Sequence, residues 1–163
     1  MAIKVPANVL TMPRNEVAEF FITFARFEFA LKASGFGENG RWGAEANWNR
    51  FADRIESCFN ASTTEELRTA VEYLMTKPPK RQHYAHKALG WRSRTPFPDS
   101  SCMRKLLFHV RGVRNNLFHG AKFLERESDD PCRDAQLVSA ASVVLAECLR
   151  IAPEVAELFY ADP

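Results

Sequence analysis

Residues 101–120 read SCMRKLLFHVRGVRNNLFHG, and as a helix they would present two different faces. At about 100° per residue, the apolar side chains share one broad arc, which comprises Met103, Leu106, Val110, Val113 and Leu117 and is extended by Leu107 and Phe118. A second, polar stripe at spacings of seven, four and four comprises Arg104, Arg111, Asn115 and His119. The pattern therefore predicts a core helix with one polar edge.

Arg114 lies outside this polar stripe, near the edge of the apolar arc. An arginine in that position needs a partner, because an unpaired buried charge is very costly. The stretch EVAEFFITFARFEFALKAS, residues 16–34, offers Glu28, which lies between or beside two apolar stripes. One stripe is Phe20, Phe24, Phe27 and Leu31, the other is Phe21, Ile22, Ala25 and Phe29, and the solvent-facing side is Glu16, Glu19, Thr23 and Arg26. We expect a buried pair between Glu28 and Arg114, which could serve only to fix the packing of two helices.

Helix patterns dominate the rest of the chain. They cover residues 16–34, 44–60, 65–77, 101–120 and 133–150, with a short further turn at 154–161. Residues 77–98 separate the third and fourth helices and are expected to form a long basic loop; no strand is expected anywhere. The sequence thus predicts one all-α domain over residues 1–163, a bundle of about five main helices.

Composition limits the class of protein. The chain has 163 residues, is 46% hydrophobic and contains thirteen Phe, which is enough apolar material for the core of one domain. We expect no membrane span, because no apolar run approaches the roughly 18 to 20 residues that a span requires. We expect no signal peptide, because the start MAIKVPANVLTMPRNE lacks a long apolar region and a small-residue cleavage site. The four cysteines are far apart, and His83 and His86 have no second ligand pair, so we expect a cytoplasmic protein without disulfides, metal or cofactor.

The segment 77–98 is strongly basic and has aromatic residues within it. It contains no acid, and its cations are Lys77, Lys80, Arg81, Lys87, Arg92 and Arg94. Tyr84 and Trp91 lie among them, which suits a phosphate backbone with bases that stack. A solvated loop whose charge keeps it in water remains an equal alternative.

The end of the 101–120 stretch has the residue types that metal-free RNA cleavage requires. His119 precedes Gly120, a good helix terminator, and can exchange a proton near pH 7. Arg114 supplies a planar donor fork for phosphate, and Asn115 or Asn116 can orient the histidine or hold a ligand oxygen. Cleavage needs the 2′-hydroxyl deprotonated and the leaving oxygen protonated. One histidine does not serve both steps comfortably, whereas a second copy across a twofold axis could supply the other.

Two stretches together resemble a known family. VRNNLFHG, residues 113–120, resembles the signature of the HEPN superfamily, and FARFEFALKASGF, residues 24–36, is similar to the first helix of bacterial HEPN-like proteins. The resemblance implies a helical bundle that dimerises, with Arg114 and His119 as the catalytic pair and Asn115 beside them. Active family members are metal-independent endoribonucleases, many of them in toxin–antitoxin, antiphage and CRISPR systems. Some family toxins carry a tyrosine two residues after the histidine, where this chain has Ala121, so we do not expect its modification here.

The sequence supports three interpretations. The first is a cytoplasmic, homodimeric HEPN-type ribonuclease with an antitoxin or defence-system partner protein. In it the RNA would be guided by a set of cations, Lys80, Arg81, Lys87, Arg92, Arg94 and Arg111. The second is a catalytically silent HEPN-like module that binds a nucleotide, RNA or a protein, and the third is an unrelated helical interaction domain.

Overall fold

The computed structural model describes residues 12–41, 43–118 and 132–162, and the prediction of a mostly helical chain is confirmed for these residues. Their helices are α1 (Arg14–Leu31), α2 (Trp48–Ile55), α3 (Glu65–Thr76), α4 (Cys102–Phe118), α5 (Arg133–Ile151) and α6 (Pro153–Tyr160). A π-helical turn, η1 (Lys32–Phe36), follows α1. Two antiparallel hairpins complete these residues: β1 (Gly37–Gly40) with β2 (Gly43–Ala46), and β3 (Arg81–Ala85) with β4 (Ala88–Arg92).

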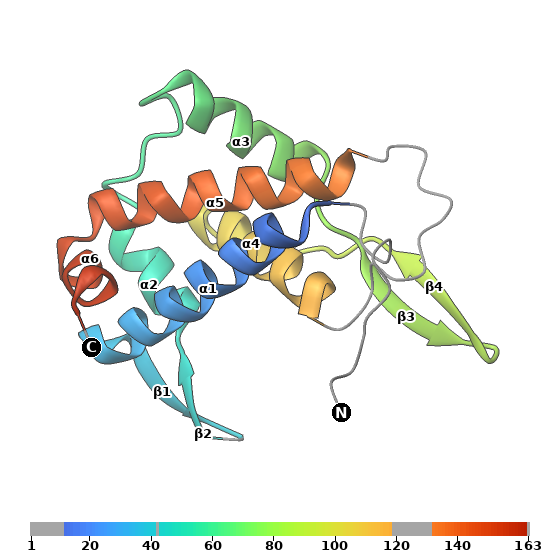
Figure 1. Cartoon of the computed structure of the whole chain (residues 1–163), viewed down its shortest axis with the longest axis horizontal. Helices are drawn as coiled ribbons and strands as arrows, with labels where there is room; N and C mark the ends of the chain where they lie inside the picture. Colours follow the sequence, from blue (N-terminus) through green and yellow to red (C-terminus); the bar gives the residue numbers. More distant parts are fainter. Residues whose placement is uncertain (1–11, 42, 119–131, 163) are drawn as a thin grey trace.

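The hydrophobic core lies where α1, α4 and α5 run side by side, with α3 packed along the other side of α5 (Figure 1). The predicted apolar arc of α4 is buried at Met103, Leu106, Leu107, Val110 and Val113. An aromatic cluster joins α1 to α2, because the Phe27 ring stacks on Trp48 at 5.5 Å between centroids and meets Phe51 edge-on. Burial of such rings is the largest single source of core stabilisation per side chain.

The prediction that no strand forms is wrong in two places. The sequence predicts one helix over residues 44–60, but β2 occupies residues 43–46, and α2 begins at Trp48 after Asn47 accepts a hydrogen bond from the Arg50 amide at 2.8 Å. Residues 81–92 form a hairpin in place of the expected loop. The short strands contain Gly, Glu and Ala, which have low strand propensity, and the β3–β4 turn lacks the usual Asn-Gly signal. Both hairpins form through backbone pairing between their strands, which the strand propensity of single residues does not encode.

The faces of α1 differ from their predicted assignment. The stripe of Phe20, Phe24, Phe27 and Leu31 is buried, as expected. The second stripe is not: Ile22 is 64% exposed and Phe29 is 49% exposed, and Ala25 between them is also exposed. Arg26, which the pattern assigns to the solvent side, reaches α6, where its Nε donates to the Phe159 carbonyl oxygen at 2.9 Å. Periodicity locates two apolar stripes but does not tell which one faces the core.

A close contact joins α4 to the segment before β3. A Cβ atom at Gly112 would lie 2.9 Å from Cγ of Pro79 and 3.1 Å from Nη1 of Arg94. Glycine at this position therefore lets Pro79 and Arg94 lie directly against the α4 backbone. This approach fixes where the β3–β4 hairpin leaves the helical body.

His109 is buried on α4 beneath this contact. It is 4% exposed, and its Nδ1 atom has no hydrogen-bond partner among the described residues. Burial, with a smaller contribution from the positive charge of Arg94, lowers the pKa of the imidazole below its usual range. The side chain is therefore neutral in the folded protein at pH 7.

We predict that His109 makes the fold sensitive to mild acid. A folded-state pKa below the unfolded value of about 6.5 means that the unfolded chain binds more protons as pH falls below that value, so the free energy of unfolding decreases. His109→Leu should reduce the loss of Tm measured by circular dichroism between about pH 7.5 and pH 5. His86→Asn, which removes an exposed histidine, serves as the control and should leave that loss unchanged. An equal loss of Tm in His109→Leu and the unaltered protein would contradict the prediction.

Candidate functional site

Arg114 lies near the C-terminal end of α4, at the surface between two phenyl rings. Its guanidinium carbon lies 5.5 Å from the ring centroid of Phe24 and 5.2 Å from that of Phe118. Its Nη1 donates to Oδ1 of Asn115 at 3.1 Å, and its Nη2 lies 3.8 Å from Oε2 of Glu28. The side chain is 28% exposed, so the guanidinium is oriented by its neighbours and still reaches solvent.

Glu28 joins Arg114 to the aromatic core. Its Oε1 accepts a hydrogen bond from Nε1 of Trp48 at 3.3 Å, while Oε2 faces Arg114. The structure thus brings Glu28 and Arg114 together, but the carboxylate is 32% exposed and the separation is longer than a hydrogen bond. The expectation of a buried ion pair is corrected to a half-exposed contact, which contributes at most about 1 kcal/mol.

The two asparagines of the motif have separate contacts. Asn115 holds Arg114, as described, whereas Nδ2 of Asn116 donates to the Lys80 carbonyl oxygen at 2.7 Å. Asn116 therefore fastens the start of β3 to α4. His119 and Ala121 lie outside the described residues, so the proposed proton carrier is placed only by its position in the chain, directly after Phe118.

The cations of the basic segment divide into two groups. Lys80, Arg81, Lys87 and Arg92 are exposed on the β3–β4 hairpin or at its start. Arg94 is half-buried, and its guanidinium carbon lies 4.0 Å from the centroid of the Phe108 ring. Arg94 therefore has a packing role that the sequence did not indicate. The sequence signal for this role was Gly112, a glycine inside a predicted helix, against which Arg94 lies.

Four arginines form a continuous series, the arginine row: Arg81, Arg94, Arg111 and Arg114. Burial, and then repulsion from Arg111 and Arg81, lowers the pKa of Arg94. Burial lowers the pKa of Arg111 as well, and repulsion from Arg114 adds to this effect. Glu28, Glu45 and Glu38 act on Arg111 in the opposite direction. Repulsion links Arg81 to Arg94, Arg94 to Arg111 and Arg111 to Arg114, and at Arg111 the attraction of Glu28 and of Glu45 each exceeds the repulsion from Arg114.

Apolar side chains reach the surface along α1 and at the end of α4. We call the set Phe21, Ile22, Phe29 and Phe118 the apolar face; the Phe21 and Phe118 rings stack at 5.5 Å between centroids beside Arg114, whereas the Phe29 ring lies 5.3 Å from the Arg26 guanidinium. Ile22, Phe29 and Phe118 are exposed, and Phe118 also contacts the Arg114 guanidinium. Exposed apolar surface of this kind is typical of a contact with another macromolecule. A partner on this face would border Arg114.

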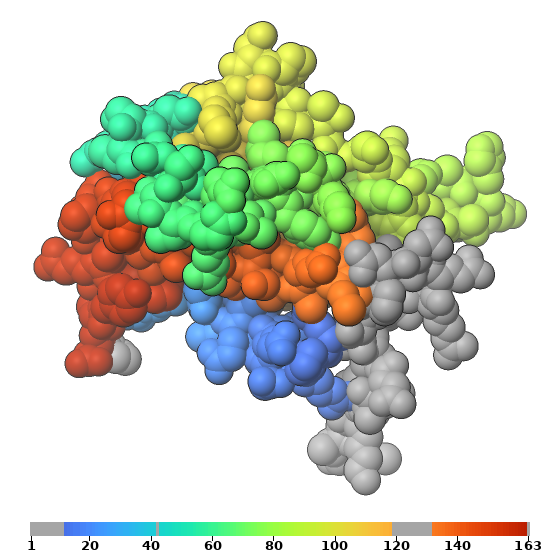
Figure 2. All heavy atoms as spheres, turned by 90° about the horizontal axis from the view of Figure 1, so that it is seen from above, coloured from blue at the N-terminus to red at the C-terminus, as the bar shows by residue number. Residues whose placement is uncertain are grey.

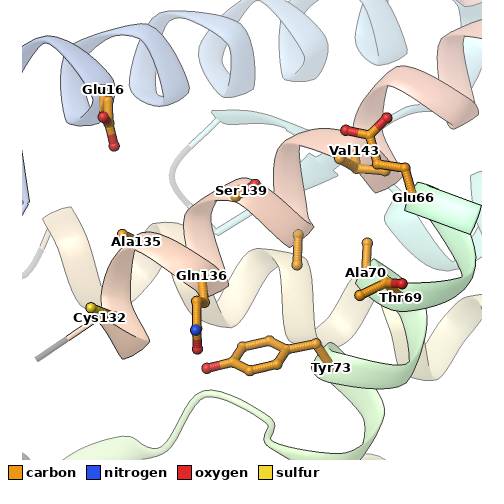
Figure 3. A pocket seen from close by; sticks show the side chains of 11 residues that line it. Glu16, Glu66, Thr69, Ala70, Tyr73, Cys132, Ala135, Gln136, Ser139 and Val143 are labelled. Carbon is orange, nitrogen blue, oxygen red and sulfur yellow. The ribbon is translucent and has the colours of Figure 1, made fainter. Parts of the chain in front are cut away.

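A separate cavity of about 580 Å³ lies between α1, α3 and α5 (Figure 3). Small or apolar side chains such as Ala70, Ala135 and Val143 line it, together with the Tyr73 ring, and Glu16 and Glu66 stand at its ends. Among the described residues that line it there is no lysine or arginine. Two carboxylates without a cation repel phosphate, so this cavity is not suited to RNA. None of the predicted site residues that the structure describes lines it.

Within residues 12–41, 43–118 and 132–162, no group of three or more His, Cys, Asp and Glu side chains could hold a metal ion. In the same ranges no single helix is long and apolar enough to cross a membrane; the pair α5 and α6, bent by 111°, meets that criterion by length and composition alone.

No protein-family model, curated protein or solved structure matches this chain. Its function is therefore inferred from its own residues and their geometry.

We predict that Glu28 and Arg114 couple weakly. In a double-mutant cycle of Arg114→Ala and Glu28→Gln, read by urea denaturation, the coupling free energy should lie below about 1 kcal/mol, because water screens a half-exposed pair. The comparison pair is Arg104→Ala with Asp53→Asn on the outer side of α4, where both Nε and Nη2 of Arg104 donate to Asp53. A coupling of about 3 kcal/mol between Glu28 and Arg114 would indicate a buried ion pair and contradict this description.

Proposed function

We propose that the protein is a HEPN-type, metal-independent endoribonuclease that acts as a homodimer in the cytoplasm. The arginine row is the observation that carries the proposal, because it connects the motif Arg114 with the exposed cations of the β3–β4 hairpin. Cations that repel one another at and just below a protein surface are stabilised by a polyanion. RNA provides one phosphate per nucleotide for such a row.

Arg114 is suited to hold the scissile phosphate. Asn115 occupies one of its terminal nitrogens, and Glu28 lies beyond hydrogen-bonding distance from the other, so part of the donor fork remains available to a phosphate oxygen. In the proposed reaction the 2′-hydroxyl attacks the adjacent phosphorus, and Arg114 stabilises the additional negative charge of the phosphorane. His119 takes the 2′-hydroxyl proton or donates a proton to the leaving 5′-oxygen.

Two protomers supply the two proton transfers. Each chain carries one His119, and the apolar face next to Arg114 provides a surface on which a second copy could pack. A twofold axis near this face would bring two Arg114 and two His119 side chains to one cleft. The exposed Ile22 and Phe29 would then be buried, which accounts for apolar side chains on the outer side of α1.

The exposed cations would guide the RNA to this cleft. Lys80, Arg81, Lys87 and Arg92 can bind phosphates directly, whereas Arg94 and Arg111 act mainly by the charge that they add beneath the surface. The resemblance to HEPN proteins supports a role as a toxin or antiphage component with an antitoxin or defence-system partner.

Cleavage in EDTA tests the ribonuclease directly. His119→Ala should reduce the rate of RNA cleavage by about 10² to 10⁴-fold, the usual contribution of a general acid or base. Arg114→Ala should reduce it as strongly, because it removes the charge that stabilises the phosphorane. Arg104→Ala removes an arginine of α4 that binds Asp53 and should leave the rate unchanged. Total RNA and a defined single strand serve as substrates, with gel electrophoresis as the readout.

The catalytically silent module predicts a different result from the same experiment. If wild-type protein binds RNA but shows no EDTA-resistant cleavage that His119→Ala removes, the Arg–Asn–His motif has a structural or binding role. Cleavage that is equal in the wild type and His119→Ala would instead point to a contaminating nuclease. Either result would overturn the ribonuclease proposal.

The dimer prediction concerns the apolar face. Ile22→Glu places a carboxylate in the proposed interface and should convert a dimer to a monomer in light scattering at micromolar concentration, with cleavage lost in parallel. Met75→Glu provides a matched control, because Met75 is also an exposed apolar residue but lies on α3. A monomeric mass for the wild type across this range would contradict the paired site.

A further inference from the structure

The β3–β4 hairpin projects from the helical body, as both views show (Figures 1 and 2). Its register pairs Arg81 with Arg92, and Tyr84 with Leu89. Because side chains alternate along a strand, these two pairs lie on opposite faces of the hairpin. The hairpin therefore has a cationic face and a face with exposed apolar side chains.

The cationic face carries an unfavourable pair. Arg81 and Arg92 stand directly opposite each other, and like charges in this position destabilise an antiparallel pair. Both side chains are exposed, and within the described part of the chain no ion pair with a carboxylate is present at either one. Cations also protect exposed strand edges from aggregation, but lysines separated along the edge would do so without this repulsion. A phosphate between the two guanidinium groups would relieve it.

The opposite face carries an aromatic ring in solvent. Tyr84 is 70% exposed, and its cross-strand neighbour Leu89 is 52% exposed. Gln82 and Trp91 continue this face toward the helical body. A phenol ring beside an aliphatic side chain is a flat surface on which a nucleobase can stack. The same hairpin carries cations, which favours a nucleic acid over an apolar protein segment as the ligand.

The turn places two further basic residues at the tip of the hairpin. His86 and Lys87 adopt left-handed backbone angles, with φ of 51° and 61°, in a two-residue turn where Asn-Gly is the usual choice. Non-glycine residues in this region are under strain, and such strain concentrates at functional positions. The side chain of Lys87 is thereby presented to solvent beyond Tyr84.

The base of the hairpin is fastened to the helix that carries Arg114. Asn116 bonds to the Lys80 carbonyl oxygen before β3, and Arg94 packs on Phe108 after β4. Pro79 lies against the α4 backbone at Gly112. Both ends of the hairpin are thus held on α4, within two turns of Arg114, so the hairpin has a defined position relative to the motif.

We propose that the β3–β4 hairpin is a two-faced RNA-recognition element, in which Arg81 and Arg92 bind a phosphate and Tyr84 with Leu89 stacks one unpaired base. The base must be unpaired, because the faces of bases within a duplex are covered by their neighbours. The choice of RNA as ligand rests on the proposed function. The hairpin would then select an unpaired base at a set distance from the scissile phosphate that Arg114 binds.

Binding to RNA that cannot be cleaved tests this proposal separately from catalysis. The probe is a fluorescently labelled 2′-O-methyl oligonucleotide of about 12 nucleotides, used as a single strand and annealed to its complement. Tyr84→Ala should weaken binding of the single strand by about 5- to 150-fold, the reduction expected for one stacked base. Tyr84→Phe is the matched control and should retain wild-type affinity, because it keeps the ring. Neither variant should change the affinity for the duplex.

The salt dependence separates the two faces. Tyr84→Ala removes no charge and should leave the slope of log affinity against log salt unchanged. The double variant Arg81→Gln with Arg92→Gln should reduce the magnitude of that slope for the single strand by about 0.7 for each phosphate that the variant no longer binds. Circular dichroism confirms that each variant is folded.

Three outcomes would overturn the proposal: equal single-strand affinity in Tyr84→Ala and the wild type, equal wild-type affinity for single strand and duplex, or no binding of the probe. A lower mass of Tyr84→Ala in light scattering would instead assign this face to a protein contact. Binding as expected, without EDTA-resistant cleavage of ordinary RNA, would remove the ribonuclease but leave the recognition element in place. If Tyr84→Ala left both cleavage and RNA binding unchanged, the recognition element would be removed and the ribonuclease would stay in place.

Discussion

Trp48 connects the core of this protein to its candidate site. Its ring is buried against Phe27, and its only polar side-chain atom, Nε1, donates to Glu28. A buried indole requires a hydrogen-bond acceptor, so this requirement sets the position of one carboxylate oxygen. The other oxygen then faces Arg114. Packing of Trp48 in the core thus orients the Glu28 carboxylate, which itself remains partly exposed to water.

Charge repulsion opposes this packing along α4. Arg111 and Arg94 are partly removed from water, where their positive charges are less well solvated, and they lie near other arginines. A fold selected only for stability would place apolar or paired side chains there. The carboxylates of Glu28, Glu38 and Glu45 offset part of the repulsion at Arg111. The exposed cations of the β3–β4 hairpin, which adjoin this row at Arg81, are the physical basis for proposing a polyanionic ligand.

The two hairpins leave the helical body in different directions and differ in charge (Figure 1). The β1–β2 hairpin brings Glu38 and Glu45 toward Arg111, whereas β3–β4 brings Arg81 toward Arg94. A polyanion that approached this surface would be repelled on one side and attracted on the other. The electrostatic potential therefore changes from negative to positive across the surface around Arg114, and the two hairpins supply this difference.

The sequence by itself determined that the chain is mostly helical and which face of α4 enters the core, because 3.6-residue periodicity is a local property. The cost of an unpaired charge pointed to Glu28 as a partner for Arg114, but how closely the two meet is a tertiary contact. Tertiary structure decided the rest. Pairing of short strands turned residues 81–92 into a hairpin, and packing on α6 and α2 left Ile22 and Phe29 in solvent while Phe27 was buried. Burial against Phe108 gave Arg94 a structural contact that its basic neighbours lack. These outcomes depend on contacts between residues distant in the chain, which neither propensity nor periodicity encodes.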